Sequence, residues 1–255
     1  MTNQNPNGEL LTTIENAVAT LEFGHPASNS FPSELLNRLT NELNILSNNP
    51  AVSVIILKSS GSGVFCAGAS FDELKAVTNL AEATKFFSGF ANVLNAMRNC
   101  SKTIVGRIHG KAVGGGVGIA AACDYALATN GSDIKLSELS IGIGPFVIEP
   151  AVSRKIGKSA MTEMALEATE WKSSNWAYQK GLYAKVFETT AELDLEITAF
   201  ANKLASYNPE ALTEIKKVFW EGTNNWSTLL YERAEISGKL LLSDFSKNAL
   251  NQLKK

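Results

Sequence analysis

The fold of this chain is decided by one glycine-rich stretch, Ile108-His109-Gly110-Lys111-Ala112-Val113-Gly114-Gly115-Gly116. Residues 104–108, in which Ile104, Val105 and Ile108 are β-branched, lead into it and predict a β-strand. The alanine-rich residues 117–123 predict a helix buried on all sides, because they offer no polar face. Glycines between a strand and a helix leave backbone N–H groups unpaired where the helix dipole favours negative charge. The stretch predicts either a site for an anion or a developing oxyanion, or a close packing that only glycine permits.

A second segment of small residues also lies between a predicted strand and a predicted helix, Phe65-Cys66-Ala67-Gly68-Ala69-Ser70. The glycine triplet is not a P-loop, since no Gly-Lys-Ser/Thr follows it, and it lacks the Gly-x-Gly-x-x-Gly spacing of a dinucleotide fold. Two such segments are able to aim two N–H groups at one oxygen. Reactions of thioesters that pass through an enolate require such an arrangement, because the enolate oxygen has to be stabilised by preorganised hydrogen-bond donors.

Regular elements follow one another along the chain without a low-complexity linker. Apolar runs predict a hairpin within residues 10–23 and strands at 52–57, 104–108, 125–129 and 134–136. Helical spacing predicts helices at 33–46, 159–168, 173–180, 191–206, 209–220 and 229–253, with one or two helices at 72–98. Mixed strands and helices of this kind predict an α/β fold. We expect a core of residues 1–194 and a C-terminal helical region of residues 195–255.

The composition narrows the class of protein. The 255 residues are 45% hydrophobic, enough to bury a substantial core, and a net charge of −2 gives no field that favours nucleic acid or a membrane surface. The first residues lack the basic and apolar regions of a signal peptide, and no apolar run approaches a membrane span. A cytoplasmic protein is expected. The three cysteines show no metal-ligand spacing and predict reduced, structural thiols.

Several runs in order resemble the signatures of the crotonase (enoyl-CoA hydratase/isomerase) superfamily. They are the two segments above, then Ala122-Cys123-Asp124 and Leu136-Ser137-Glu138-Leu139, and the resemblance covers roughly residues 10–220. It implies a crotonase-like spiral of β-β-α units in residues 1–194, followed by the helical region. It also implies an acyl-CoA substrate and assembly as a homotrimer or homohexamer.

The resemblance also assigns site residues. The oxyanion hole would be the backbone N–H groups of Ala69 and Gly115. The CoA part of the substrate would lie against Ala67, Gly68 and Gly114, and His25 would either contact the CoA end or face only solvent. Coenzyme A would enter only as part of the substrate, so no separate cofactor is expected. Neither histidine has a partner at metal-ligand spacing, so no metal is expected either.

Hydratases of this family resemble one another in using two glutamates, and this sequence has only the second. Glu138 fits the second position, whereas Gly118 stands at the first. A single carboxylate is able to move a proton between two carbons, which is isomerase chemistry, whereas water addition normally needs two groups. Without the resemblance, Glu138 would be an ordinary carboxylate at a strand end or a helix start. With it, Glu138 is the expected proton-transfer group, and both hydration and isomerisation stay open.

Glu149 is a candidate replacement for the missing glutamate. Apolar residues flank it, which would raise the pKa of its carboxyl if it were buried. It either acts in catalysis, or faces solvent, or pairs with Arg154.

Other polar residues have structural interpretations. Asp124 is expected to accept backbone N–H bonds at a turn, and His109 to be a hydrogen-bonded structural residue. Lys216 and Lys217 either approach the CoA phosphates or lie on a solvated helix face.

The sequence thus predicts an enzyme that hydrates or isomerises the double bond of an enoyl-CoA thioester through a stabilised enolate. The alternative is an acyl-CoA-binding protein with weak or lost hydratase activity, because Gly118 removes one carboxylate of the pair.

Overall fold

A computed structural model of the chain describes residue 5 and residues 7–252. Within them, one sheet has six strands in the order β1-β2-β3-β4-β6-β8. The first pair is antiparallel and the others are parallel. The strands are β1 (Glu9–Glu15), β2 (Val18–Gly24), β3 (Val54–Ser59), β4 (Thr103–Ile108), β6 (Tyr125–Thr129) and β8 (Lys185–Phe187). A small second sheet pairs β5 (Ala112–Val113) with β7 (Ile134–Lys135) in parallel.

The predicted hairpin and strands are confirmed. In the turn between β1 and β2, Asn16 and Ala17 have φ values of 51° and 63°. Two successive residues with positive φ match the right-handed twist of a tight hairpin. The strands β5 and β8 were not predicted, because two or three residues are too short to show a period.

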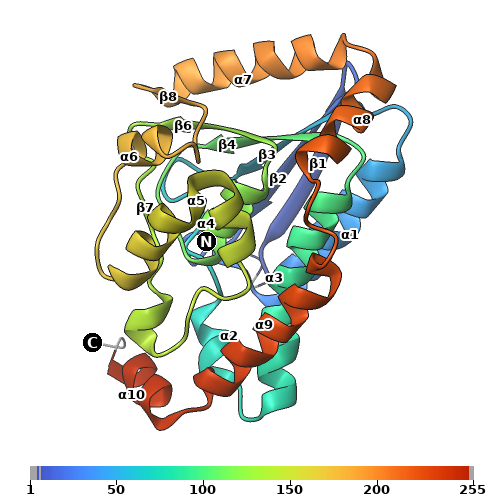
Figure 1. Cartoon of the computed structure of the whole chain (residues 1–255). Coiled ribbons are helices and arrows are strands. Elements are labelled where there is room, and N and C mark those ends of the chain that lie inside the picture. Colours follow the sequence, from blue (N-terminus) through green and yellow to red (C-terminus); the bar gives the residue numbers. More distant parts are fainter. Residues whose placement is uncertain (1–4, 6, 253–255) are drawn as a thin grey trace.

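The helices cover both faces of the large sheet. They are α1 (Ser33–Asn48), α2 (Phe71–Ala76), α3 (Leu80–Asn99), α4 (Gly115–Ala122), α5 (Glu149–Leu166), α6 (Ser174–Gln179), α7 (Thr190–Ala205), α8 (Pro209–Phe219), α9 (Trp226–Leu241) and α10 (Asp244–Gln252), with a 3-10 turn η1 (Glu138–Ile141). In Figure 1, α7 lies on one face, whereas α1 and α3 lie on the other. Two apolar cores follow from this arrangement. The smaller core packs α7 against one face of the large sheet, and the larger core packs α1, α3 and α4 on the opposite face.

Two helix predictions differ from the structure. Residues 72–98 form two helices, α2 and α3, in agreement with the expected one or two, whereas the single helix predicted at 229–253 is divided, within the described residues, into α9 and α10. The second division has a local cause, since the Ser243 hydroxyl accepts a hydrogen bond from the Ser246 N–H at 3.3 Å and caps a new helix. Element α5 consists of two helical segments that meet at Gly157, whose φ of 78° and ψ of 161° are not helical. The second segment agrees with the helix predicted at 159–168, whereas the first, which begins at Glu149, was not predicted.

The division expected at residues 194 and 195 falls inside α7 (Thr190–Ala205). Extensive contacts connect the C-terminal helices to the core, the largest set being between α3 and α9. The C-terminal helices thus pack against the sheet and α3, and the division at residues 194 and 195 stays a prediction.

A buried polar cluster also ties α8 to the sheet. Asp124 accepts hydrogen bonds from the Ile104 N–H and the Trp220 Nε1, each at 2.7 Å. Its carboxylate also lies 2.9 Å from the Lys216 Nζ, and both side chains are about 95% buried, with exposed fractions of 5% and 4%. The structural interpretation of Asp124 is therefore confirmed. Neither interpretation of Lys216 was right, since this lysine is buried in an ion pair.

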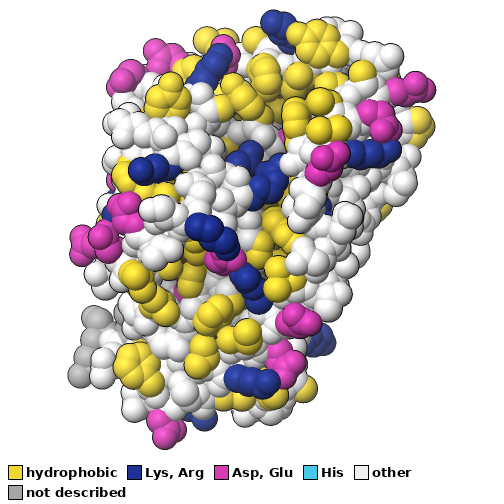
Figure 2. Space-filling view, viewed as in Figure 1, with side chains coloured by type: hydrophobic (Ala, Val, Ile, Leu, Met, Phe, Trp, Pro, Cys, Tyr) yellow, Lys and Arg dark blue, Asp and Glu magenta, His cyan; other side chains and the backbone are white. Residues whose placement is uncertain are grey.

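Apolar side chains remain exposed on the C-terminal helices. Figure 2 shows such side chains gathered at the end of the molecule where α7 and α8 lie. Leu195 on α7 and Phe245 on α10 are 74% and 66% exposed. Surface of this kind is what self-association would cover, and the homotrimer or homohexamer stays a prediction.

The described residues contain no helix long and apolar enough to cross a membrane. They also contain no group of three or more His, Cys, Asp or Glu side chains that could hold a metal ion. All three cysteines are free and buried, as predicted.

Substituting Asp124 by Ala is expected to lower the free energy of unfolding by about 3–5 kcal/mol, because it leaves the Lys216 ammonium buried without its partner. Urea denaturation measures this loss. The matched control is Glu214→Ala, which removes the partner of the adjacent Lys217 in a pair whose side chains are 68% and 66% exposed. That change should cost less than about 1 kcal/mol. Equal losses in the two variants would contradict the buried-pair argument.

Candidate active site

The two glycine-containing segments lie against each other. The Val113 N–H donates to the Cys66 carbonyl at 2.9 Å, and the Phe65 N–H donates to the Lys111 carbonyl at 3.0 Å. Gly68 has φ 87°, and a Cβ atom on it would lie only 2.8 Å from the Val113 carbonyl oxygen. The absence of a side chain at this position therefore sets how closely the segments approach.

This approach brings two uncommitted N–H groups to one place. Backbone pairing with Phe31 engages the neighbours of Ala69, since the Phe31 N–H donates to Gly68 at 2.8 Å and the Ser70 N–H donates to Phe31 at 3.0 Å. Gly115 is the first residue of α4, where N–H groups have no partner within the helix. Within the described residues, neither the Ala69 nor the Gly115 N–H donates a hydrogen bond.

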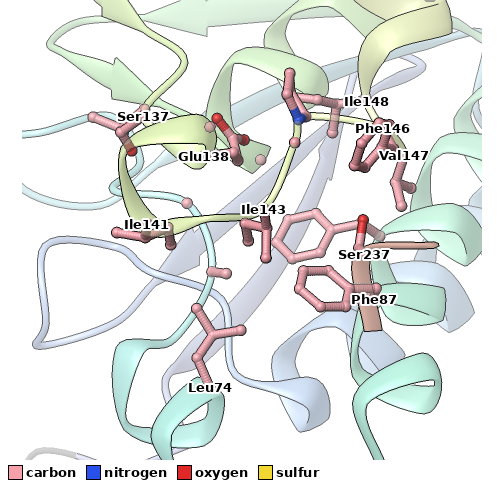
Figure 3. A pocket seen from close by; sticks show the side chains of 18 of the residues that line it. Leu74, Phe87, Ser137, Glu138, Ile141, Ile143, Phe146, Val147, Ile148 and Ser237 are labelled. Carbon is pink, nitrogen blue, oxygen red and sulfur yellow. The ribbon is translucent and has the colours of Figure 1, made fainter. Parts of the chain in front are cut away.

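Both residues line an apolar pocket together with Glu138 (Figure 3). The cavity has a volume of about 70 Å³. Its walls come from α2, α3, the start of α4, η1, the loop before α5, and α9. The lining residues are Ala67, Gly68, Ala69, Phe71, Leu74, Phe87, Phe90, Val113, Gly114, Gly115, Ser137, Glu138, Ile141, Ile143, Gly144, Pro145, Phe146, Val147, Ile148 and Ser237. Of these described residues, only Glu138 has an ionisable side chain.

Glu138 is the first residue of η1, and its carboxyl lies beside the glycine triplet. A Cβ atom on Gly114 would lie 2.8 Å from the Glu138 Oε1, so glycine leaves room for the carboxyl. The other oxygen, Oε2, is buried without a hydrogen-bond partner among the residues that the structure describes. Burial raises the pKa of the Glu138 carboxyl to about 7. A carboxyl with this pKa is able to accept and return a proton near neutral pH.

The position of the missing glutamate is filled by a side chain from elsewhere. A Cβ atom on Gly118 would lie 2.4 Å from the Ile148 Cγ2. Ile148 is the residue before α5, and it lines the pocket wall. The structure therefore places a hydrocarbon side chain against residue 118. The sequence showed that a glutamate is absent there, but not what occupies the space.

Glu149 is not among the residues that line this pocket. It lines a separate cavity of about 470 Å³ and binds Lys158, Ser153 and Arg233. Burial alone would raise the pKa of the Glu149 carboxyl, but these hydrogen bonds outweigh it and lower the pKa to about 2. The expectation of a raised pKa at Glu149 is therefore wrong, and its ion-pair partners are Lys158 and Arg233 instead of Arg154.

The other predicted residues divide between two places. Ala67, Gly68 and Gly114 line the pocket with Glu138, whereas His25 lines a different cavity of about 430 Å³. His109 is buried, and neither of its ring nitrogens has a hydrogen-bond partner within the described chain, so the expected hydrogen bond is absent. Burial lowers the pKa of His109 to about 4, which keeps the ring neutral.

Sequence reasoning located most of the pocket wall by segment but not by residue. The segment 72–98 and the loop after Glu138 were the expected walls of the acyl pocket, and Phe87, Phe90, Phe146 and Ile148 lie in them, whereas Ser237 had no signal that tied it to a site. They come together because the loop before α5 and helix α9 meet α3 in three dimensions.

Comparison with known proteins places this geometry in a family. The family model described as enoyl-CoA hydratase/isomerase matches residues 13–250. The chain is 28% identical to a short-chain-enoyl-CoA hydratase of Clostridium acetobutylicum, over 92% of this chain and 90% of that protein. It is also 28% identical to a peroxisomal Delta(3,5)-Delta(2,4)-dienoyl-CoA isomerase of Arabidopsis thaliana, over 69% and 67%.

The fold agrees with a solved structure as well. The crystal structure of an enoyl-CoA hydratase from Bacillus halodurans superposes with a TM-score of 0.88 at 20% identity, covering 95% of this chain and 99% of that one. The predicted crotonase-like α/β fold is confirmed. The chain belongs to the crotonase superfamily and is an enzyme of the enoyl-CoA hydratase/isomerase family.

Proposed function

We propose that this enzyme is an enoyl-CoA isomerase, which moves the double bond of a 3-enoyl-CoA into conjugation with the thioester. One observation carries the proposal. Within the described lining, Glu138 is the only ionisable side chain of the pocket that also contains the unpaired N–H groups of Ala69 and Gly115.

The reaction needs one base and one oxyanion site. The Glu138 carboxylate removes a proton from C2 of the substrate, and the electrons move onto the thioester oxygen. The N–H groups of Ala69 and Gly115 hold this dienolate oxygen. The protonated Glu138 then returns the same proton to C4, and the double bond comes to lie between C2 and C3. The raised pKa of Glu138 suits both steps, because the carboxyl has to be a base first and an acid afterwards.

Hydration is less well supported by this pocket. Water addition needs a group that holds and activates water in addition to the group that protonates carbon. Ile148 occupies the space beside Gly118, and the remaining polar side chains of the described lining are the hydroxyls of Ser137 and Ser237. Glu149 is bound to two cations in another cavity and is not placed to replace the missing carboxylate.

The CoA part of the substrate is proposed to pass Ala67, Gly68 and Gly114, which lie beside the two N–H groups. His25 belongs to a cavity next to β2 and the residues after β3, where a more distant part of CoA would bind. Coenzyme A would serve only as part of the substrate. An acyl-CoA-binding protein without turnover remains the rival proposal, and the next experiment separates the two.

Glu138→Gln is expected to reduce isomerisation of 3-hexenoyl-CoA by about 10²–10⁴-fold, because the amide cannot accept the C2 proton. Binding of the saturated hexanoyl-CoA should persist, since the oxyanion donors are unchanged. Chromatography with mass spectrometry measures conversion to 2-hexenoyl-CoA, and calorimetry measures binding.

The matched variant for that experiment is Glu149→Gln, which should retain at least about a tenth of the isomerase activity if Glu149 takes no part in proton transfer. Equal loss in both variants would favour Glu149 as the replacement glutamate. Tight binding with no turnover in the parent enzyme would favour the binding protein.

The pH dependence of kcat/KM reports the Glu138 carboxyl in the free enzyme. Since burial raises its pKa to about 7, the ionised base is lost as pH falls through that value. Isomerisation should therefore rise with pH through about 7 and level off above it, as measured by initial rates in constant ionic strength buffers. A kcat/KM that stays constant down to about pH 5 would mean an ordinary carboxyl pKa and would contradict the assignment.

Gly118→Glu combined with Ile148→Ala is expected to introduce hydration of crotonyl-CoA, because it restores the second carboxylate and removes the side chain in its way. The product would be heavier by one water, and the rate should exceed that of the parent by about tenfold or more. Ile148→Ala alone is the control, since it opens space without adding a carboxylate. Hydration by the single variant at the same rate would show that space, and not a second acid, limits the reaction.

A further inference from the structure

The pocket wall away from Glu138 is hydrocarbon. Four aromatic rings, from Phe71, Phe87, Phe90 and Phe146, line the pocket together with aliphatic side chains. In Figure 3, Phe87, Phe146 and Ser237 lie on the side of the pocket opposite Ser137 and Glu138. No lysine, arginine or histidine occurs in the described lining, so nothing there would pair with an anionic group of a ligand.

Two cations on the helices that line the pocket make their contacts elsewhere. Arg233 precedes Ser237 by one turn of α9, but it binds the Glu149 carboxylate and donates to the Phe146 carbonyl at 3.3 Å. It lines the neighbouring cavity and not this one. Lys75 has its Nζ 5.7 Å from the centre of the Phe71 ring at the edge of the pocket, and it is not a lining residue either.

Arg233 is also neutralised where it lies. Glu149 accepts hydrogen bonds from Arg233, Lys158 and Ser153. The ion pair with Glu149 keeps the Arg233 guanidinium in the neighbouring cavity, outside the pocket that Phe146 lines. A carboxylate entering the pocket would therefore lose its hydration without gaining an ion pair, and it would meet the like charge of an ionised Glu138.

Resting on the proposed function, we propose that the enzyme selects acyl-CoA thioesters whose acyl group is uncharged and rejects those that end in a second carboxylate. The acyl group is held by contact with the aromatic and aliphatic wall. The selection lies in the missing countercharge, because an unpaired carboxylate is costly to bury and a methyl group is not.

Hexanoyl-CoA and adipoyl-CoA test this selection. Both are saturated and of equal chain length, so neither can undergo the chemical step. They differ only in a terminal methyl group against a terminal carboxylate. Titration calorimetry with the parent enzyme at about pH 8 should give at least about 100-fold weaker binding of adipoyl-CoA. Binding of the two ligands within about threefold of each other would overturn the inference and leave the proposed function standing. Failure to bind hexanoyl-CoA would overturn both.

A pair of variants locates the effect in the pocket. Ser237→Lys places an ammonium group at the buried end, where Ser237 is 1% exposed, and should tighten adipoyl-CoA binding by about tenfold or more. Ser237→Met adds a side chain of similar length without charge and should not. Equal effects of both variants on adipoyl-CoA would contradict a missing countercharge. If thermal melting shows that either variant is unfolded, the comparison of the two ligands on the parent enzyme decides.

Discussion

The close approach of two backbone segments is the constraint on which the site depends. The bond from the Val113 N–H to the Cys66 carbonyl, at 2.9 Å, joins the segment after β3 to the segment after β4. Because β3 and β4 are parallel neighbours in the sheet, both segments leave the same sheet edge. Gly68 then permits the final contact, since any side chain there would strike Val113. The geometry of Ala69 and Gly115 is thus fixed by the sheet rather than by flexible loops.

The rest of the pocket is apolar, and it acts on Glu138 by excluding water instead of by offering hydrogen-bond partners. Apolar walls leave the Glu138 Oε2 without a partner in the described chain, and this desolvation raises the pKa of the carboxyl to about 7. An unpaired buried carboxyl is unfavourable for folding, and the ion pair of Asp124 with Lys216 shows how the same chain satisfies a buried carboxylate elsewhere. In the proposed reaction, this unsatisfied carboxyl is the group that carries the proton.

Local sequence patterns predicted the elements whose signal is local. The spacing of leucines predicted α1 and the apolar run predicted β3, whereas the pocket residues Ala67, Gly68 and Gly114 were assigned through the family resemblance that the glycine-containing segments carry. The environment of Glu149 was not predictable in this way. Its apolar neighbours suggested a raised pKa, whereas Arg233, which is 84 residues away, helps to lower it to about 2. The start of α5 was missed because Gly157 and Pro150 are ordinarily signals of a loop.

The absence of a glutamate at residue 118 and the apolar pocket wall are coupled by one packing contact. Ile148 reaches its place only because Gly118 has no Cβ, since a Cβ atom there would lie 2.4 Å from the Ile148 Cγ2. A carboxylate at residue 118 would therefore need Ile148 to move, and moving it would disturb the wall that keeps water from Glu138. In the proposed isomerisation, a pocket that excludes water would favour direct transfer of the proton by Glu138 between two carbons of the substrate. In the proposed function, the residue pair 118 and 148 is therefore what favours isomerisation over hydration at this site.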